Sequence, residues 1–144
     1  MTKDPRYPIG KYETAPYSEV QKNKWINDLR HLPKDLEMAI QNLDAAQIQT
    51  PYREGGWKVQ QLVHHIADSH MNAFARFKLG LTEDLPTVKA YDENAWVSMA
   101  DALDTPINYS ITLLFALHER WANLLDSLTE AQWQRKKQMQ MVQV

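Results

Sequence analysis

The chain contains no cysteine among its 144 residues. This absence excludes disulfide bonds, thiolate metal ligands and a cysteine nucleophile. Glycine is also scarce, with four residues, which is too few for a turn-rich sheet protein or for a glycine-rich phosphate-binding loop. The sequence has no Walker motif, no dinucleotide-binding fingerprint and no G-x-S-x-G elbow. The common signatures of nucleotide binding and of serine-hydrolase chemistry are therefore missing.

Neither sign of charge dominates, because 16 basic residues stand against 18 acidic ones and the net charge is −2. This balance disfavours a broad basic surface for nucleic acid and an electrostatic membrane anchor. No apolar run reaches the length of about 18 residues that a membrane-spanning helix needs. The polar start over residues 1–6 does not resemble a signal peptide. We therefore expect a cytoplasmic protein with no nucleic-acid partner and no membrane partner.

Apolar residues recur at helical spacing in three long segments, which predicts three long helices. The first begins at the capping residue Ser18, ends near Leu43 and contains Pro33, where we expect a kink or a brief break. The second ends around Gly80, and the third has Pro106 as its first residue. The apolar stripes of the first and third helices consist of Trp25, Leu29, Leu32, Leu36, Ile40 and Leu43, and of Ile107, Ile111, Leu114, His118, Trp121, Leu125 and Leu128.

The remaining segments complete one domain over residues 1–144, whose apolar share of 44% is ordinary for a globular protein. Residues 1–17 are rich in proline and tyrosine and predict an extended arm. Residues 83–105 predict a long connection with a short helix, and a capping box at Thr129 predicts a last short helix. The long connection favours an all-α four-helix bundle, although only three bundle helices can be counted. Residues 135–144 change in character and form either a frayed tail or the product of an interrupted reading frame.

Three of the five histidines, His64, His65 and His70, lie close together in the second predicted helix. Each residue turns a helix by about 100°, so His65 and His70 project about 140° apart. No pair has the i, i+4 spacing that chelates an ion from one helix. A metal at this helix would therefore take one histidine from it and its other ligands from elsewhere.

Two further polar residues accompany this cluster. Asp68 is either a solvated helix charge or a carboxylate that orients His64 or His65 by accepting an N–H. His118 lies within the apolar stripe of the third helix, where it is either a hydrogen-bonded core residue or a polar group that lines a pocket.

Several motifs together carry a resemblance to a known family. They are YPIG at 7–10, TPYREGGW at 50–57, VHHIADSHMN at 63–72, RFK at 76–78, LTE at 81–83, YDENAW at 91–96 and LHERW at 117–121. Over residues of about 7 to 135 the sequence resembles the YfiT group of the DinB-like superfamily.

The resemblance implies a four-helix bundle, a cytoplasmic homodimer and one divalent metal, zinc or nickel, that is bound by three histidines. Members are labelled metal-dependent hydrolases, and the group is also described as bacillithiol S-transferases, which join a low-molecular-weight thiol to an electrophile. The first ligand of the family matches His65. The other two lie in an H-x-x-x-H on a fourth helix, which has no counterpart in this sequence. The resemblance thus implies a chain that is shortened at its C-terminus and lacks the fourth helix.

Two hypotheses for function follow. The first is an enzyme that acts on a small-molecule substrate and uses a metal on His65 to activate water or a thiol, with Asp68 as orienting group and His118 as pocket group. The second is a catalytically inactive remnant that acts as a dimerising or small-molecule-binding helical protein. We expect His65, rather than His64 or His70, to face the interior near His118. We also expect an exposed apolar groove between the three long helices.

Overall fold

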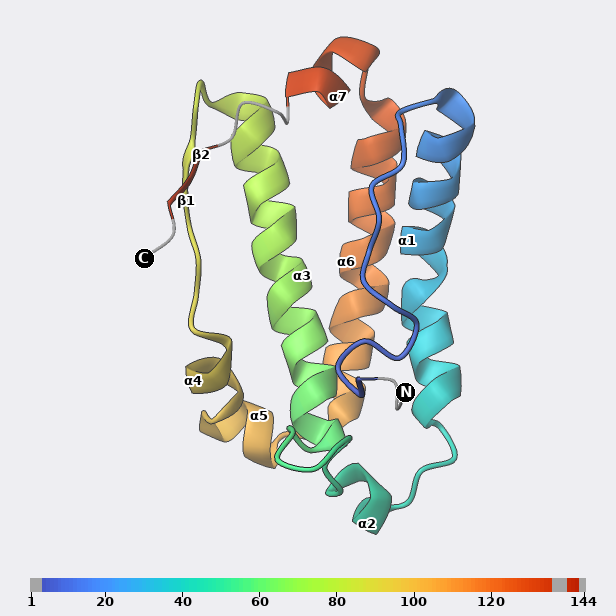
Figure 1. Cartoon of the computed structure of the whole chain (residues 1–144), viewed down its shortest axis with the longest axis vertical. Helices are drawn as coiled ribbons and strands as arrows, with labels where there is room; N and C mark the ends of the chain where they lie inside the picture. The colour runs from blue at the N-terminus through green and yellow to red at the C-terminus, as the bar shows by residue number, and fades with distance from the viewer. Residues whose placement is uncertain (1–3, 136–139, 143–144) are drawn as a thin grey trace.

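The computed structural model describes residues 4–135 and 140–142, and three long helices dominate it (Figure 1). The all-α prediction is confirmed, apart from a short pair of parallel strands. No helix within the described ranges is both long and apolar enough to cross a membrane. In chain order the elements are α1 (Glu19–Ile40), α2 (Ala45–Ile48), α3 (Val59–Thr82), β1 (Thr87–Lys89), α4 (Glu93–Val97), α5 (Ala100–Asp104), α6 (Ile107–Ser127), α7 (Glu130–Arg135) and β2 (Gln140–Val142).

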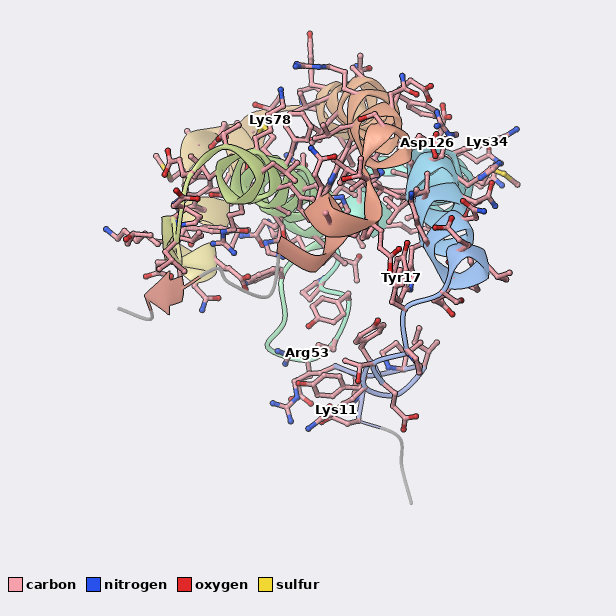
Figure 2. All side chains as sticks on the ribbon, turned by 90° about the horizontal axis from the view of Figure 1, so that it is seen from above. Lys11, Tyr17, Lys34, Arg53, Lys78 and Asp126 are labelled. Carbon is pink, nitrogen blue, oxygen red and sulfur yellow. The ribbon has the colours of Figure 1, made fainter. Side chains whose placement is uncertain are left out.

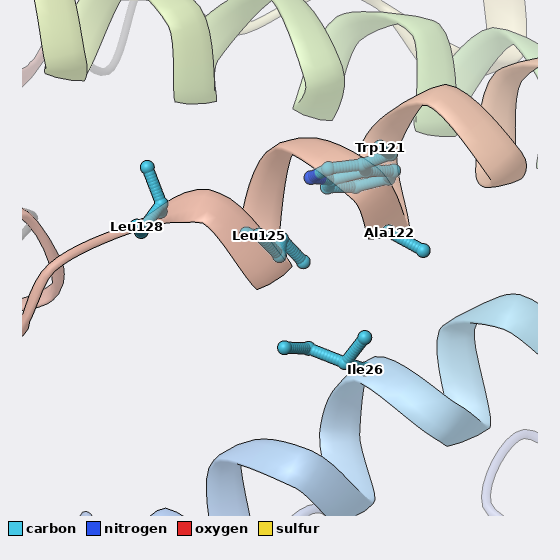
Figure 3. Packing of buried hydrophobic residues seen from close by; sticks show 5 residues of the cluster. All are labelled: Ile26, Trp121, Ala122, Leu125 and Leu128. Carbon is cyan, nitrogen blue, oxygen red and sulfur yellow. The ribbon is translucent and has the colours of Figure 1, made fainter.

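Helix α6 lies between α1 and α3 and packs against both (Figure 1). Its apolar stripe follows the sequence prediction, since Leu114 is 0% exposed and all but the first of the seven stripe positions are buried. Burial of such a stripe is the main source of stability for a helix in a bundle. Toward the C-terminal end of α6 the central cluster consists of Ile26, Trp121, Ala122, Leu125 and Leu128 (Figure 3).

Helix α1 begins where the capping residue predicts, because the Ser18 hydroxyl accepts the Gln21 N–H at 3.0 Å. The helix runs unbroken through Pro33, so the predicted break is wrong. The predicted stripe of α1 is only half-buried, and Ile26 and Pro33 are the apolar residues buried deepest. A proline has no backbone N–H, so the carbonyl of Leu29, four residues earlier, loses the donor that a helix normally supplies.

The connection between α3 and α6 is held to α3 by glutamine side chains. The Gln60 amide donates to the carbonyls of Leu103 at 2.7 Å and Thr105 at 3.1 Å, and Gln61 donates to the carbonyl of Val97 at 2.9 Å. These bonds fix α4 and α5 against the N-terminal half of α3. Pro106 is the capping residue of α6, so the helix begins one residue later than predicted.

The two ends of the chain run along the bundle. The described part of the arm, residues 4–17, contains no helix or strand and passes in front of α6 (Figure 1). Thr129 and Gln132 form the predicted capping bonds of α7. Of the predicted divergent tail over residues 135–144, residues 136–139 and 143–144 lie outside the described residues. Strand β2 pairs in parallel with β1, with Val88 opposite Met141.

The expected apolar groove lies between the three long helices and has a volume of about 620 Å³. Its walls come from α1, α3, α6, α7 and the arm, and Tyr17 points from the arm toward this region (Figure 2). The lining residues are Tyr12, Ala15, Pro16, Tyr17, Trp25, Leu29, Phe77, Trp121, Leu125 and Trp133. The arm therefore borders the groove without filling it.

Replacing Leu114 tests the central role of α6. We expect Leu114→Ala to lower the free energy of unfolding by about 2–5 kcal/mol, because it empties a fully buried site. The neighbouring Leu113 is 39% exposed, so Leu113→Ala is the matched control and should cost less than about 1 kcal/mol. Urea denaturation followed by circular dichroism measures both values, and equal losses would show that α6 is not the packing centre.

Candidate functional site

His64 is a structural residue that ties α3 to the start of α6. Its ring is 6% exposed. Nε2 lies 2.7 Å from the carbonyl oxygen of Thr105, which accepts a hydrogen bond and cannot donate one. Nδ1 lies 2.6 Å from the hydroxyl oxygen of Ser110 and forms a hydrogen bond with it. Both ring nitrogens are thus occupied, which leaves no lone pair for a metal.

His65 follows His64 in α3 and has a different environment. Its side chain is half-buried, and its ring packs against Trp57 with centroids 4.7 Å apart. Nδ1 is buried and has no hydrogen-bond partner among the described residues. A buried polar atom without a partner is unusual and carries an energetic cost. His65 therefore offers a nitrogen that an additional group would satisfy.

Asp68 lies one turn beyond these histidines and is half-buried. Burial raises the pKa of its carboxyl group, the negative charge of Asp101 adds to the shift, and the imidazoles of His64 and His65 oppose it. Within the described residues no hydrogen bond joins this carboxylate to either histidine. Because both nitrogens of His64 bond elsewhere, the predicted orientation of His64 by Asp68 is wrong. The same role toward His65 stays a prediction.

His118 is almost completely buried, at 1% exposed, and it connects α6 to α1. Its Nδ1 lies 2.6 Å from the carbonyl oxygen of Leu29. This is the carbonyl that Pro33 leaves without a helical donor. A carbonyl only accepts, so Nδ1 of His118 carries the proton and Nε2 of the neutral ring carries a lone pair.

His70 extends this arrangement to α3. Its Nδ1 lies 2.6 Å from Nε2 of His118. The two rings are nearly coplanar, with an interplanar angle of 19° and centroids 4.8 Å apart, so the hydrogen bond lies in the plane of both rings. The indole of Trp121 meets both rings edge-on. A chain of hydrogen bonds thus runs from His70 through His118 to Leu29 and crosses all three long helices.

The environment keeps the rings of His70 and His118 uncharged at neutral pH. Burial lowers the pKa of His70 to about 4, and the nearby imidazoles of His118 and His65 add to the effect. Burial also lowers the pKa of His118, and its hydrogen bond to Leu29 opposes that change. Neutral rings are what the two hydrogen bonds require.

The histidine positions correct part of the sequence prediction. His64 is buried more deeply than His65, and His70 rather than His65 contacts His118. His65 is nevertheless not exposed, and its assignment as a metal ligand stays a prediction. Sequence reasoning missed the pairing of His70 with His118. The one available signal was Pro33, because an internal proline indicates a free carbonyl one turn earlier.

The described residues do not form a complete metal site by themselves. Within residues 4–135 and 140–142, no three histidine, aspartate or glutamate side chains are grouped so that they could hold an ion. A catalytic zinc site uses three protein ligands and one open position. His65, with its unpartnered Nδ1, fits the role of one such ligand, but the set around it is too small to hold the metal.

Comparison with known proteins identifies the family to which this chain belongs. The profile of the DinB superfamily matches residues 28–142. The chain belongs to the DinB superfamily.

DinB relatives from bacilli match almost the whole chain. A Bacillus subtilis protein named "Putative metal-dependent hydrolase YfiT" is 47% identical over 130 residues, which cover 90% of this chain and 73% of the relative. A Geobacillus kaustophilus protein with the same description is 52% identical over 136 residues, which cover 93% of this chain and 76% of the relative. The solved structure of YfiT superimposes with a TM-score of 0.86 at 46% identity and covers 89% of this chain and 74% of its own. That structure is described as a four-helix bundle of unusual topology, so the bundle prediction is confirmed.

Acidification tests the neutral state of His70. The pKa of His70 is about 4 in the folded chain against 6.5 as its ordinary value, so the unfolded chain binds more protons between these values. Stability that is present above pH 6.5 is therefore lost as the pH falls. We expect a loss of about 1 kcal/mol between pH 7 and pH 5, after allowance for the partial exposure of the ring. Urea denaturation at both values measures the loss, and His70→Gln should show less of it. An identical loss in both proteins would place the titrating group elsewhere.

Proposed function

We propose that this DinB chain is a metal-dependent hydrolase in which His65 provides one ligand of a divalent metal. The observation that carries the proposal is the buried, unpartnered Nδ1 of His65. The relatives named as metal-dependent hydrolases support it, since they are about half identical over nearly the entire chain. The residues of the sequence outside the described ranges contain no histidine, aspartate or glutamate, so the other ligands would have to come from another chain, such as the second subunit of a dimer.

The finer assignment concerns the metal and the reaction. Zinc and nickel both accept imidazole ligands, and each fits a site with His65. The reacting group is water in a hydrolase and a low-molecular-weight thiol, such as bacillithiol, in a thiol transferase. A homodimer that works on a small-molecule substrate belongs to the same proposal, and sedimentation velocity would test the dimer.

The residues beside His65 suggest how the site would handle protons and water. The raised pKa of Asp68 brings its carboxyl group nearer to the range in which it exchanges a proton with a reactant. The Trp57 ring packs against His65 at an interplanar angle of 56°, and its indole N–H donates to Asn94 at 3.1 Å. This bond holds the Trp57 ring in place beside His65.

Metal titration tests the proposal. We expect weak binding of Zn²⁺ by the chain as given, because a lone imidazole gains no chelate effect from the described residues. His65→Ala should reduce the observed binding. His31→Ala is the control, since His31 is exposed and distant in sequence, and it should leave binding unchanged. Isothermal titration calorimetry with Zn²⁺ and then Ni²⁺ measures the affinities. Binding that is the same in His65→Ala and the parent chain would contradict the proposal.

A second candidate function is non-catalytic binding of a small apolar molecule in the groove. The groove volume of about 620 Å³ lies within the range of small-molecule sites, which are mostly apolar and carry few polar groups. Six aromatic side chains line it. The indole nitrogen of Trp121 is buried without a hydrogen-bond partner in the described residues. The matching ligand is a small, mostly apolar molecule.

A fluorescent dye tests this second function. We expect 8-anilinonaphthalene-1-sulfonate to bind the parent chain, and Trp25→Lys to weaken binding at least about tenfold, because it places a charge on the apolar wall. Trp96→Lys is the control, since Trp96 is also partly exposed but lies outside the groove. Near-ultraviolet circular dichroism checks that both variants stay folded. Equal affinity in the two variants would show that the dye binds elsewhere.

A further inference from the structure

In the series of hydrogen bonds from Leu29 to His70, one ring nitrogen, Nε2 of His70, takes no part. His118 must donate from Nδ1 to the Leu29 carbonyl, so its Nε2 must accept. His70 must then donate from its Nδ1. In a neutral ring the remaining nitrogen, Nε2 of His70, carries a lone pair. It makes no hydrogen bond within the described residues.

His70 and His65 border the same strip of α3. With about 100° per residue, Ile66 and Ala73 project between the directions of His65 and His70. Phe77 projects close to His70 and lines the groove. The imidazole of His65 is also close enough to His70 to contribute to its lowered pKa, so a group bound at His65 would lie near His70.

We propose that His70 is a specificity-determining residue of the proposed site at His65, where it presents Nε2 as a hydrogen-bond acceptor. His118 is the residue that positions His70. The ligand chemistry that this acceptor selects is a neutral O–H, N–H or S–H group, such as water, an alcohol or a thiol. A neutral ring with a bare nitrogen repels the lone pairs of a carboxylate or phosphate, so anions are disfavoured at this position. The placement of this acceptor beside a reactant rests on the proposed function, whereas the protonation pattern does not.

The protonation pattern follows from covalent structure as much as from packing. Pro33 removes the backbone donor of Leu29, the freed carbonyl selects the Nδ1–H form of His118, and His118 selects the Nδ1–H form of His70. At each step one group must donate and the other must accept. A substitution at position 118 therefore changes which nitrogen of His70 carries the proton, although His70 itself is not substituted.

Nitrogen-15 spectroscopy of the full chain with labelled histidine tests the proposal. Long-range proton–nitrogen correlation at pH 7 should show protonated Nδ1 and unprotonated Nε2 in His70. His118→Leu should abolish this preference, because leucine accepts no hydrogen bond. His118→Gln should restore it, because its amide can donate to Leu29 and accept from His70. Leu128→Ala disturbs the buried core without entering the chain of bonds, and it should keep the pattern. A protonated Nε2 in the parent chain, or an unchanged pattern in His118→Leu, would overturn the proposal.

Access to Nε2 is measured separately with diethyl pyrocarbonate, which attacks unprotonated imidazole. At pH 6, peptide mass spectrometry should find His70 modified and the buried His118 protected, with exposed His31 as the positive control. Protection of His70 in the folded chain would overturn its role toward ligands. Neither experiment uses metal, so the expected pattern together with unchanged Zn²⁺ binding in His65→Ala would reject the proposed function and leave this inference standing. The reverse combination would reject only the inference.

Discussion

The hydrogen bond between Nδ1 of His118 and the carbonyl of Leu29 is the contact on which the arrangement of the long helices depends. It joins α6 to α1 at a place where the ring is 1% exposed. An unpaired polar group at such a place costs about 1–3 kcal/mol. The bond therefore fixes how α6 sits against α1, and the second nitrogen of the same ring fixes how α3 approaches. Apolar packing supplies most of the stability, but it is not directional, whereas this pair of bonds is.

The three clustered histidines of α3 have different roles, because their rings have different hydrogen-bond partners. His64 bonds to Ser110 and Thr105 and holds the start of α6. His70 bonds to His118 in the middle of α6. His65 lies between them in the chain, packs on Trp57 and keeps a buried nitrogen without a partner. Three histidines within seven residues of one helix thus differ in their hydrogen bonds: His64 and His70 each bond to α6, and His65 keeps a buried nitrogen without a partner among the described residues.

Much of the fold was accessible from the sequence, because helical periodicity and capping chemistry are local. The Ser18 and Thr129 caps and the stripe of α6 were predicted and are confirmed. The burial of α1 was predicted less well, since a stripe shows which residues are apolar but not which neighbour each one meets. The candidate site was harder still, because the angle of about 100° per residue ranks faces on one helix only. Which histidine meets His118 depends on how α3 and α6 are rotated against each other, and no local pattern encodes that rotation.

The proline in α1 has a consequence for the natural variation of this family. A residue with an N–H at position 33 would give the Leu29 carbonyl a backbone donor again, so this carbonyl would no longer depend on the ring at position 118. Conversely, a side chain at 118 that cannot donate would leave the Leu29 carbonyl buried and unpaired beneath Pro33. Positions 33 and 118 are 85 residues apart in the chain, yet both determine which donor the Leu29 carbonyl has. Among DinB relatives the two positions should therefore covary.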